Sequence, residues 1–462
     1  LYYRYQFIYG PPSPMVIATG IDRTGADGKL TLSLPADLSE SQTGQTLTFE
    51  AMTTDFSQNL VSGRASVVAH LSQVYPGVRS KSYVGQVGKE QTFELVALDW
   101  NGKPISGQNL NVEIVERRWY SVQEQDASGR LTWTSNVEEI PVTSFTDIVT
   151  NQRGEATVSF TPEKGGTYAA RVRARDAGGR EGRASAYMWV AGEEYIPWRQ
   201  TNDHSFDLVA DKDEYLPGDT ASLLIASPFQ GTAYALVTVE RGKVRQEEVV
   251  RLDNNSTVYE LAITPDMAPN AYVSVLVVKG VDETNPRPGF KMGIVQLHVD
   301  RSSYELQVQV TPDRPTAGPG ENVVYTISTK DAKGNPVSAE LSLGLSDLAT
   351  LSLMDPNSAP VLDYFYSNRN LNVWTTMPLA LSIEDYNADI QASIPPEGGG
   401  MGSGGGKGGG EFGVVEVRQD FPDTAFWAAH VVTNQNGEAT VAVRLPDNLT
   451  TWRMDARAVT LY

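Results

Sequence analysis

The sequence predicts an all-β fold of tandem antiparallel β-sandwiches of the fibronectin or immunoglobulin type. Segments in which apolar and polar residues alternate, such as 157–160, 440–443 and 31–34, have the period of a half-buried strand. Glycines lie between such segments, where a tight turn needs a positive φ. Sequence motifs recur at a spacing of about 100 residues. Strands and turns at this spacing are typical of stacked β-sandwiches.

The alternation also predicts which side chains face a core. These are the apolar members of the alternating segments: Val158, Phe160, Val441, Val443, Leu32 and Leu34. Further strands are expected over 169–174, 221–225 and 272–278. Helical periodicity is scarce, and the best helical candidate is 378–392.

The composition is that of a soluble globular protein. The chain has 462 residues, of which 40% are hydrophobic, and no run of about 18 uncharged apolar residues that could span a bilayer. Its net charge of −19 argues against a nucleic-acid partner, because phosphate binding needs clustered lysines and arginines. It has no cysteine, which excludes disulfides and zinc-thiolate sites within the chain.

Two stretches of the chain are copies of one pattern. The first copy has a glycine start at 88–90, an Asp-x-x-Gly-x-Pro turn at 99–104 and a closing element, TNQRGEATV, at 150–158. The second copy has the same elements at 320–322, 331–336 and 433–441. Between the turn and the closing element, 46 positions separate Pro104 from Thr150, whereas 97 separate Pro336 from Thr433. The second copy therefore contains an insertion of 51 residues.

The insertion contains a glycine tract. Ten of the thirteen residues from Gly398 to Gly410 are glycine. Glycine loses the most entropy on ordering, so we expect a mobile coil that offers a protease accessible backbone. The non-glycine residues in and beside the tract are chemically different cleavage sites: Met401 and Phe412 for apolar protease pockets, Lys407 for acidic pockets, Glu397 and Glu411 for basic ones. The alternative is a passive spacer.

A third closing element predicts that the chain is a fragment. It lies at 24–32 and is preceded by only 23 residues, whereas about 80 residues precede it in the copy that begins near His70. We therefore expect a longer parent protein and a first domain without its N-terminal part. The expected domains are 1–69, 70–192, 193–300 and 301–462, the last interrupted by the insertion. The 193–300 domain lacks the Asp-x-x-Gly-x-Pro signature.

The sequence contains no familiar metal or catalytic pattern. Its four histidines, His70, His204, His298 and His430, have no metal-binding spacing. The segments 99–102 and 211–214 resemble calcium loops only faintly and are better explained as turns. Lys407 lies among glycines but outside the frame of a phosphate-binding loop. We expect no cofactor, no metal and no catalytic activity of the chain itself.

Three segments after the tract are distinctive: VRQDFPDTAFW at 417–427, the segment 433–443 that begins with the closing element, and LPDNLTTWR at 445–453. Together they resemble the alpha-2-macroglobulin family, whose thioester proteins include the complement components. The stretch 355–366, which contains LDYFY at 362–366, resembles an element that the family has before its protease-sensitive bait region. The resemblance covers the chain as tandem macroglobulin domains and is most specific from about 301 to 462.

The resemblance implies that 394–413 is the bait region. In this family a protease cuts the bait, the molecule rearranges and the protease is trapped, often through a Cys-Gly-Glu-Gln thioester further along the chain. No thioester lies within this chain, because it has no cysteine. A bait so rich in glycine departs from the more varied family pattern. We expect Trp427 and Trp452 to be core aromatics rather than protease contacts.

We therefore expect a fragment of a bacterial-type, broad-spectrum protease inhibitor that is extracellular, on the cell surface or periplasmic. Its partners would be endopeptidases that cut the bait, together with the remaining domains of the parent chain. One alternative is a surface stalk or adhesin of stacked sandwiches, with the tract as a spacer. Another is a family member without a thioester that acts in a cell-surface complex.

Overall fold

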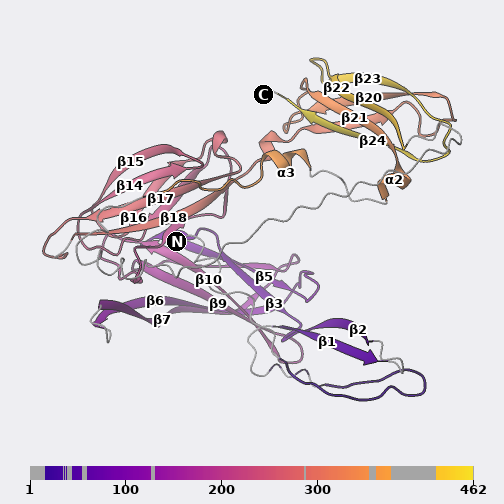
Figure 1. Cartoon of the computed structure of the whole chain (residues 1–462). Coiled ribbons are helices and arrows are strands. Elements are labelled where there is room, and N and C mark those ends of the chain that lie inside the picture. The colour runs from indigo at the N-terminus through magenta and orange to yellow at the C-terminus, as the bar shows by residue number, and fades with distance from the viewer. Residues whose placement is uncertain are drawn as a thin grey trace, which may run out of the picture.

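The computed structural model describes residues 16–34, 36, 38, 44–54, 60–125, 131–285, 288–352, 360–375 and 423–460. Almost all of their regular structure is β-strand, as the sequence predicts. The strands form a separate hairpin and three two-sheet sandwiches, called the first, second and third sandwich in chain order (Figure 1). The domain boundaries expected from the sequence stay predictions. The helix expected over 378–392 lies outside the described residues.

The separate hairpin consists of β1 (Gln45–Thr54) and β2 (Leu60–Ala69), which pair antiparallel. The strand expected over 31–34 is wrong, because this segment has no regular structure. Leu32 and Leu34 are exposed instead of facing a core. A strand needs a hydrogen-bonded neighbour, and within the described residues the segment pairs with none. Alternation alone cannot supply such a neighbour.

The first sandwich packs a three-stranded sheet, in the order β3-β5-β8, on a five-stranded sheet, β4-β10-β9-β6-β7. The strands are β3 (Tyr75–Ser80), β4 (Val84–Gln86), β5 (Gln91–Leu98), β6 (Asn109–Gln125), β7 (Leu131–Val149), β8 (Glu155–Phe160), β9 (Gly166–Arg175) and β10 (Glu181–Ala191). Val158 and Phe160 on β8 are buried in the core, which confirms the faces predicted for them.

The second sandwich has the same two-sheet plan, with sheet orders β11-β13-β16 and β12-β18-β17-β14-β15. Its strands are β11 (Leu208–Ala210), β12 (Glu214–Tyr215), β13 (Thr220–Ile225), β14 (Ala233–Glu240), β15 (Val244–Leu252), β16 (Thr257–Ala262), β17 (Asn270–Lys279) and β18 (Gly289–Val299). In both sandwiches the short β4 or β12 pairs parallel to its neighbour, whereas the other ladders of the described residues are antiparallel.

The third sandwich has two three-stranded sheets, β19-β20-β23 and β22-β21-β24. Its strands are β19 (Gln307–Pro312), β20 (Asn322–Lys330), β21 (Glu340–Asp347), β22 (Thr424–Val432), β23 (Glu438–Arg444) and β24 (Trp452–Val459). Two short helices, α2 (Leu348–Ser352) and α3 (Val361–Phe365), follow β21. Val443 is buried and Val441 packs against the core, as predicted.

The repeated turns have one local cause. The Asp99 carboxylate accepts the amides of Asn101 and Lys103, and the Asp331 carboxylate accepts those of Lys333 and Asn335. Each aspartate thus closes its own turn, which is the usual reason for this residue at such positions. The glycine of each turn, at 102 and at 334, has the expected positive φ, 76° and 84°.

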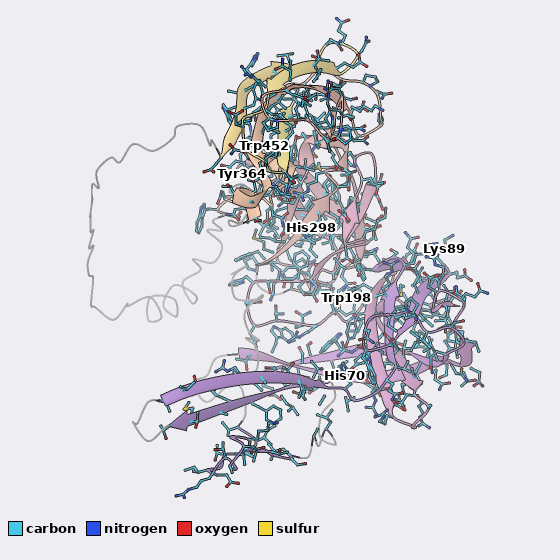
Figure 2. All side chains as sticks on the ribbon, turned by 90° about the vertical axis from the view of Figure 1, so that its right-hand side faces the viewer. His70, Lys89, Trp198, His298, Tyr364 and Trp452 are labelled. Carbon is cyan, nitrogen blue, oxygen red and sulfur yellow. The ribbon has the colours of Figure 1, made fainter. Side chains whose placement is uncertain are left out.

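A shared core joins the first and second sandwiches. Trp198 is 5% exposed, packs with Ile196 and Leu224, and donates its indole N–H to the Asn255 carbonyl at 2.7 Å. Figure 2 shows Trp198 at this junction. The Tyr83 hydroxyl adds a hydrogen bond to the Asp213 carboxylate across the same junction. The first two sandwiches are therefore joined by packing and hydrogen bonds as well as by the chain itself.

Candidate functional site

The third sandwich is built from strands on both sides of the insertion. Strands β19 to β21 precede it, and strands β22 to β24 come after it. Across the insertion, β20 pairs with β23, and β21 lies between β22 and β24. Both sheets therefore contain strands from both sides, as the colours of Figure 1 show. The core between the sheets is made by these strands, with Tyr325, Leu345 and Val443 buried in it.

The two ends of the insertion meet at one point of the sheet. The Asp347 amide, at the end of β21, donates a 2.9 Å hydrogen bond to the Asp423 carbonyl, just before β22. The Thr350 hydroxyl also reaches the Asp423 carboxylate, at 3.4 Å. The inserted residues leave the sandwich and return to it side by side, as the loop of an ordinary hairpin would.

The Asp347 carboxylate holds the exit point in place. It accepts the Ala349 amide and the Thr450 hydroxyl, each at 2.8 Å. The next amide, that of Leu348, donates to the Thr451 carbonyl at 2.9 Å. Thr450 and Thr451 belong to the LPDNLTTWR segment that carried the family resemblance. This segment therefore has a local role, which is to fix the start of the insertion against the β23–β24 connection.

Thr433 is the first residue of the closing element that follows the insertion, and it is buried. Its hydroxyl accepts the Ala339 amide at 2.8 Å and is 2.9 Å from the Thr329 hydroxyl. In the first copy, the hydroxyl of the buried Thr150 accepts the Gln108 amide at 3.0 Å. The two threonines that the sequence repeat aligns, Thr150 and Thr433, therefore make similar hydrogen bonds.

The residues expected to be cut lie outside the described part of the chain. These are the candidate cleavage sites Glu397, Met401, Lys407, Glu411 and Phe412, and the whole interval 394–413. They stay predictions. The structure places the residues on either side of them, at 375 and at 423.

One described part of the insertion, residues 360–375, contacts the second sandwich. We call residues 360–375, which begin with α3, the arm (Figures 1 and 2). Arg301, in the linker after the second sandwich, donates to the Tyr366 carbonyl at 2.9 Å and pairs with Asp363. The Tyr304 and Tyr366 rings stack with their centroids 4.5 Å apart. Burial, together with the nearby Tyr304, raises the pKa of Tyr366.

Asn270 is the most buried contact of the arm. This side chain, the first of β17, is completely buried. Its amide group donates to the Arg369 carbonyl at 2.9 Å, and its amide oxygen accepts the Arg369 N–H at 2.8 Å. The Tyr272 hydroxyl also donates to the Arg369 carbonyl, at 3.2 Å. Two residues further on, the Leu371 carbonyl accepts the Gly242 amide at 2.8 Å.

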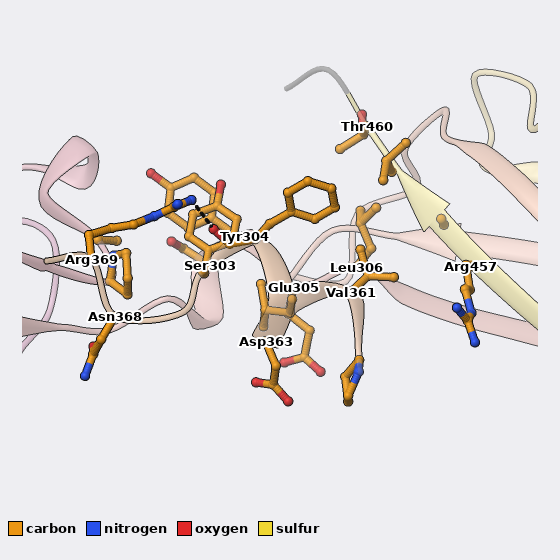
Figure 3. A pocket seen from close by; sticks show the side chains of 18 of the residues that line it. Ser303, Tyr304, Glu305, Leu306, Val361, Asp363, Asn368, Arg369, Arg457 and Thr460 are labelled. Atoms are coloured by element: carbon orange, nitrogen blue, oxygen red, sulfur yellow. Dashed lines mark hydrogen bonds between the residues drawn. The ribbon is translucent and has the colours of Figure 1, made fainter. Parts of the chain in front are cut away.

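An open cleft of about 1830 Å³ lies where the arm, the second sandwich and β24 come together. Figure 3 shows Tyr304 and Arg369 on one side of it and Arg457 and Thr460 on the other. The hydrogen bonds of the arm described above lead to the second sandwich and its linker. The cleft therefore separates the arm from much of the third sandwich to which it is covalently joined.

The expectation for Trp427 is wrong, whereas that for Trp452 is right. Trp452 is half-buried and packs against the core. Trp427 is 69% exposed and lies over Gly344 on the neighbouring strand, on the outer face of the sheet. Phe426 packs against the core instead, and successive side chains of a strand point to opposite faces. A tryptophan in an apolar run does not reveal which face it occupies.

Sequence reasoning missed the residues that hold the arm. Tyr272 lies in the strand predicted over 272–278 and Asn270 lies two positions before it, but their partner is 97 and 99 positions away, respectively. The single sequence signal for this contact was the polar side chain of Asn270 at the start of an apolar strand. Within the described residues, no group of acidic or histidine side chains could hold a metal ion, and no helix is long and apolar enough to cross a membrane.

Three family models match the chain. The bacterial macroglobulin domain 6 model matches residues 77–203, the alpha-2-macroglobulin bait region domain model matches 206–353, and the alpha-2-macroglobulin family model matches 424–461. The last two leave between them the residues 354–423, which hold the arm and the glycine tract. The first sandwich, the second sandwich and both sides of the insertion thus fall within the models.

Two relatives match the chain over most of its length. An alpha-2-macroglobulin homolog of Nostoc sp. is 28% identical over 414 residues, 87% of this chain and 21% of the relative. An alpha-2-macroglobulin of Ralstonia nicotianae is 31% identical over 321 residues, 66% of this chain and 19% of the relative. The chain therefore spans about a fifth of the length of these relatives. A solved structure of trypsin-activated alpha-2-macroglobulin from Escherichia coli is 18% identical, with a TM-score of 0.35, and the match covers 93% of this chain and 28% of that one.

Proposed function

Because this chain belongs to the alpha-2-macroglobulin family and contains its bait region domain, we propose that it is the trigger portion of a broad-spectrum protease inhibitor. In this proposal endopeptidases of different specificity cut the glycine-rich bait at 394–413. The cut starts a rearrangement of the parent protein that traps the protease. The chain itself acts as a substrate and a switch, not as an enzyme.

The meeting of Asp347 and Asp423 is the observation that carries the proposal. Since the insertion leaves and returns at one point, its middle can be cut without breaking a strand or removing a core side chain of the described residues. A cut then removes a covalent constraint while the sandwich keeps its hydrogen bonds. This combination suits a trigger, because strain held elsewhere in the parent protein is free to relax.

The charge and composition of the tract favour broad specificity. Five possible cleavage sites of three chemical kinds lie within about sixteen residues, among glycines that offer little steric selection. A protease that requires a basic, an acidic or a large apolar residue therefore finds one. We place the protein outside the cytoplasm, on the cell surface, secreted or in the periplasm, where foreign proteases are met.

Limited proteolysis tests the proposal. The native protein is treated briefly with dilute trypsin, chymotrypsin or a glutamate-specific protease, and the first cuts are located by mass spectrometry. We expect the first cut of each enzyme between 394 and 413, and a change of hydrodynamic radius of the parent protein after it. First cuts in the linkers near 193–205 or 300–306, with the tract spared, would refute the proposal.

A matched variant separates the trap from a stalk with a flexible spacer. In it the five candidate residues are replaced by glycine or serine, which keeps a glycine-rich tract of the same length without the candidate cleavage sites. A trap should then keep its fold but lose both the cuts and the change of radius. A stalk should show no such change with either sequence. The sequence after 462 in the parent protein decides whether a Cys-Gly-Glu-Gln thioester is available for covalent capture.

A further inference from the structure

We infer that the arm is a docked element of the second sandwich, and that Asn270 is the residue that positions it. The consequence rests on the proposed function: when a protease cuts the tract, the new C-terminal end stays on the second sandwich, whereas the other end stays with the third. The bait region is then held asymmetrically, because its N-terminal side is anchored by side chains of the second sandwich and of the linker after it.

Asn270 binds the arm through its backbone. Both hydrogen-bonding groups of its side chain are used on one residue, with the Arg369 N–H and the Arg369 carbonyl at 2.8 and 2.9 Å. This is the pattern with which a neighbouring strand would pair, supplied here by a side chain. With the arm in place the side chain is completely buried, and the Arg369 backbone provides the partners that water would otherwise provide. The arm is therefore part of how the second sandwich satisfies its own polar groups.

Further contacts extend this anchor along the arm. The Tyr272 hydroxyl donates to the same Arg369 carbonyl, and the Gly242 amide, in the turn between β14 and β15, donates to the Leu371 carbonyl. At the other end of the arm, Arg301 holds Tyr366 and Asp363. The contacts cover residues 363–371. Most of them go to the backbone of the arm, so they tolerate changes in its sequence.

The connectivity makes the anchor important. Before a cut, the chain leaves the third sandwich at Asp347, docks on the second sandwich through the arm, and returns to the third at Asp423. Two covalent paths therefore join the arm to the third sandwich, one through 348–359 and one through 376–422. A cut in the tract removes the second path. Within the insertion, the third sandwich is then joined to the arm only through 348–359, while the arm remains on the second sandwich.

Hydrogen exchange of the uncut protein tests the docking independently of any protease. We expect slow exchange in peptides covering 366–372, because the Arg369 amide is bonded to Asn270. In Tyr272→Phe and Asn270→Ala this exchange should be about tenfold faster or more, since each variant removes one or two hydrogen bonds to the arm. Tyr234→Phe, at an exposed tyrosine of the neighbouring β14, is the matched control and should change nothing there. Wild-type exchange at the unfolded rate would overturn the inference.

Trimming of the cut protein tests the asymmetry. After cleavage in the tract, a carboxypeptidase should shorten the new C-terminus and stop before Leu371, as read from intact masses. In Tyr272→Phe and Asn270→Ala, trimming should continue toward Tyr366. A general loss of stability would lower the melting temperature without moving this stop, so Tyr272→Phe with an unchanged melting temperature is the deciding variant. Trimming of the wild type past Leu371 would contradict the inference.

A tract that no protease cuts would contradict the proposed function alone, because the exchange experiment would still report on the arm.

Discussion

Asp347 and Asp423 are 76 positions apart in the sequence, yet the amide of the first donates a hydrogen bond of 2.9 Å to the carbonyl of the second. This contact turns a long insertion into the loop of a β-hairpin. The β21–β22 ladder continues from it, from Ser346 and Thr424 up to Glu340 and Val432. The residues proposed to be cut therefore do not belong to the strands that build the third sandwich.

Cleavage in the tract should leave the two pieces of the third sandwich associated. The C-terminal piece contributes β22, β23 and β24, which pair with β20 and β21 of the other piece and share its core. We expect both pieces to co-elute in native size-exclusion chromatography and to separate in denaturant. The melting temperature of the complex should also depend on concentration, as for any bimolecular assembly. Separation in native buffer would show that the insertion, not the ladder, holds the sandwich together.

Thr433→Val should destabilise the third sandwich. The variant keeps the size of the side chain, but the buried Ala339 amide loses its acceptor and the Thr329 hydroxyl loses a partner. An unsatisfied buried group costs about 1–3 kcal/mol, so we expect a loss of this size in the free energy of unfolding, measured with urea. Thr440→Val, at an exposed position on β23, is the control and should stay within about 0.5 kcal/mol of the wild type. Equal effects of both substitutions would remove the role assigned to the Thr433 hydroxyl.

The features that sequence reasoning predicted correctly have local causes. A strand such as 157–160 is visible because its alternation is its own property, and the Asp99 turn is visible because the aspartate binds its own backbone. The position of the insertion could also be predicted from the sequence, because two copies of one pattern could be compared within the chain. The register across it is consistent with that comparison, with Tyr325 opposite Val441.

The features that it missed depend on distant partners. Nothing near Asn270 reveals that its amide will pair with Arg369, because that contact is created by the docking of a segment 99 residues away. Trp427 faces outward because it pairs with Gly344, whereas Phe426 pairs with the buried Leu345 and packs against the core. Leu32 alternates like a strand residue but is exposed. In each case the outcome depends on which neighbour is present, and the sequence pattern does not contain that information.

Gly437→Ala should be much more harmful than Gly334→Ala. Both glycines have a positive φ, 71° and 84°, so each substitution costs about 1–2 kcal/mol of backbone strain. The space around Gly334 is open, whereas a Cβ at Gly437 would lie 2.2 Å from the Thr329 carbonyl oxygen. Relief of that clash requires a backbone shift beside Thr433 and should cost about 1–3 kcal/mol more. Urea denaturation of the two variants gives the comparison, and equal losses would mean that the turn can move without cost.

Asp176→Asn should change how the stability of the first sandwich depends on pH. The buried Asp176 carboxylate accepts the Gln73 amide at 3.0 Å and the amides of Gly178 and Arg180, and it pairs with the Arg180 guanidinium. These interactions, the Gln73 hydrogen bond first, lower the pKa of Asp176 to about 2. The folded pKa lies below the unfolded one, near 3.8, so the contribution of the carboxylate is complete above about pH 4 and is lost as the pH falls toward 2. The wild type should therefore exceed Asp176→Asn in melting temperature at pH 6, and the difference should shrink between pH 4 and 2. Asp253→Asn, at an exposed aspartate paired with Arg251, is the control, and its difference from the wild type should be small at every pH. A difference for Asp176→Asn that stayed constant down to pH 2 would show that the lost hydrogen-bond geometry, not the charge of the carboxylate, carries the effect.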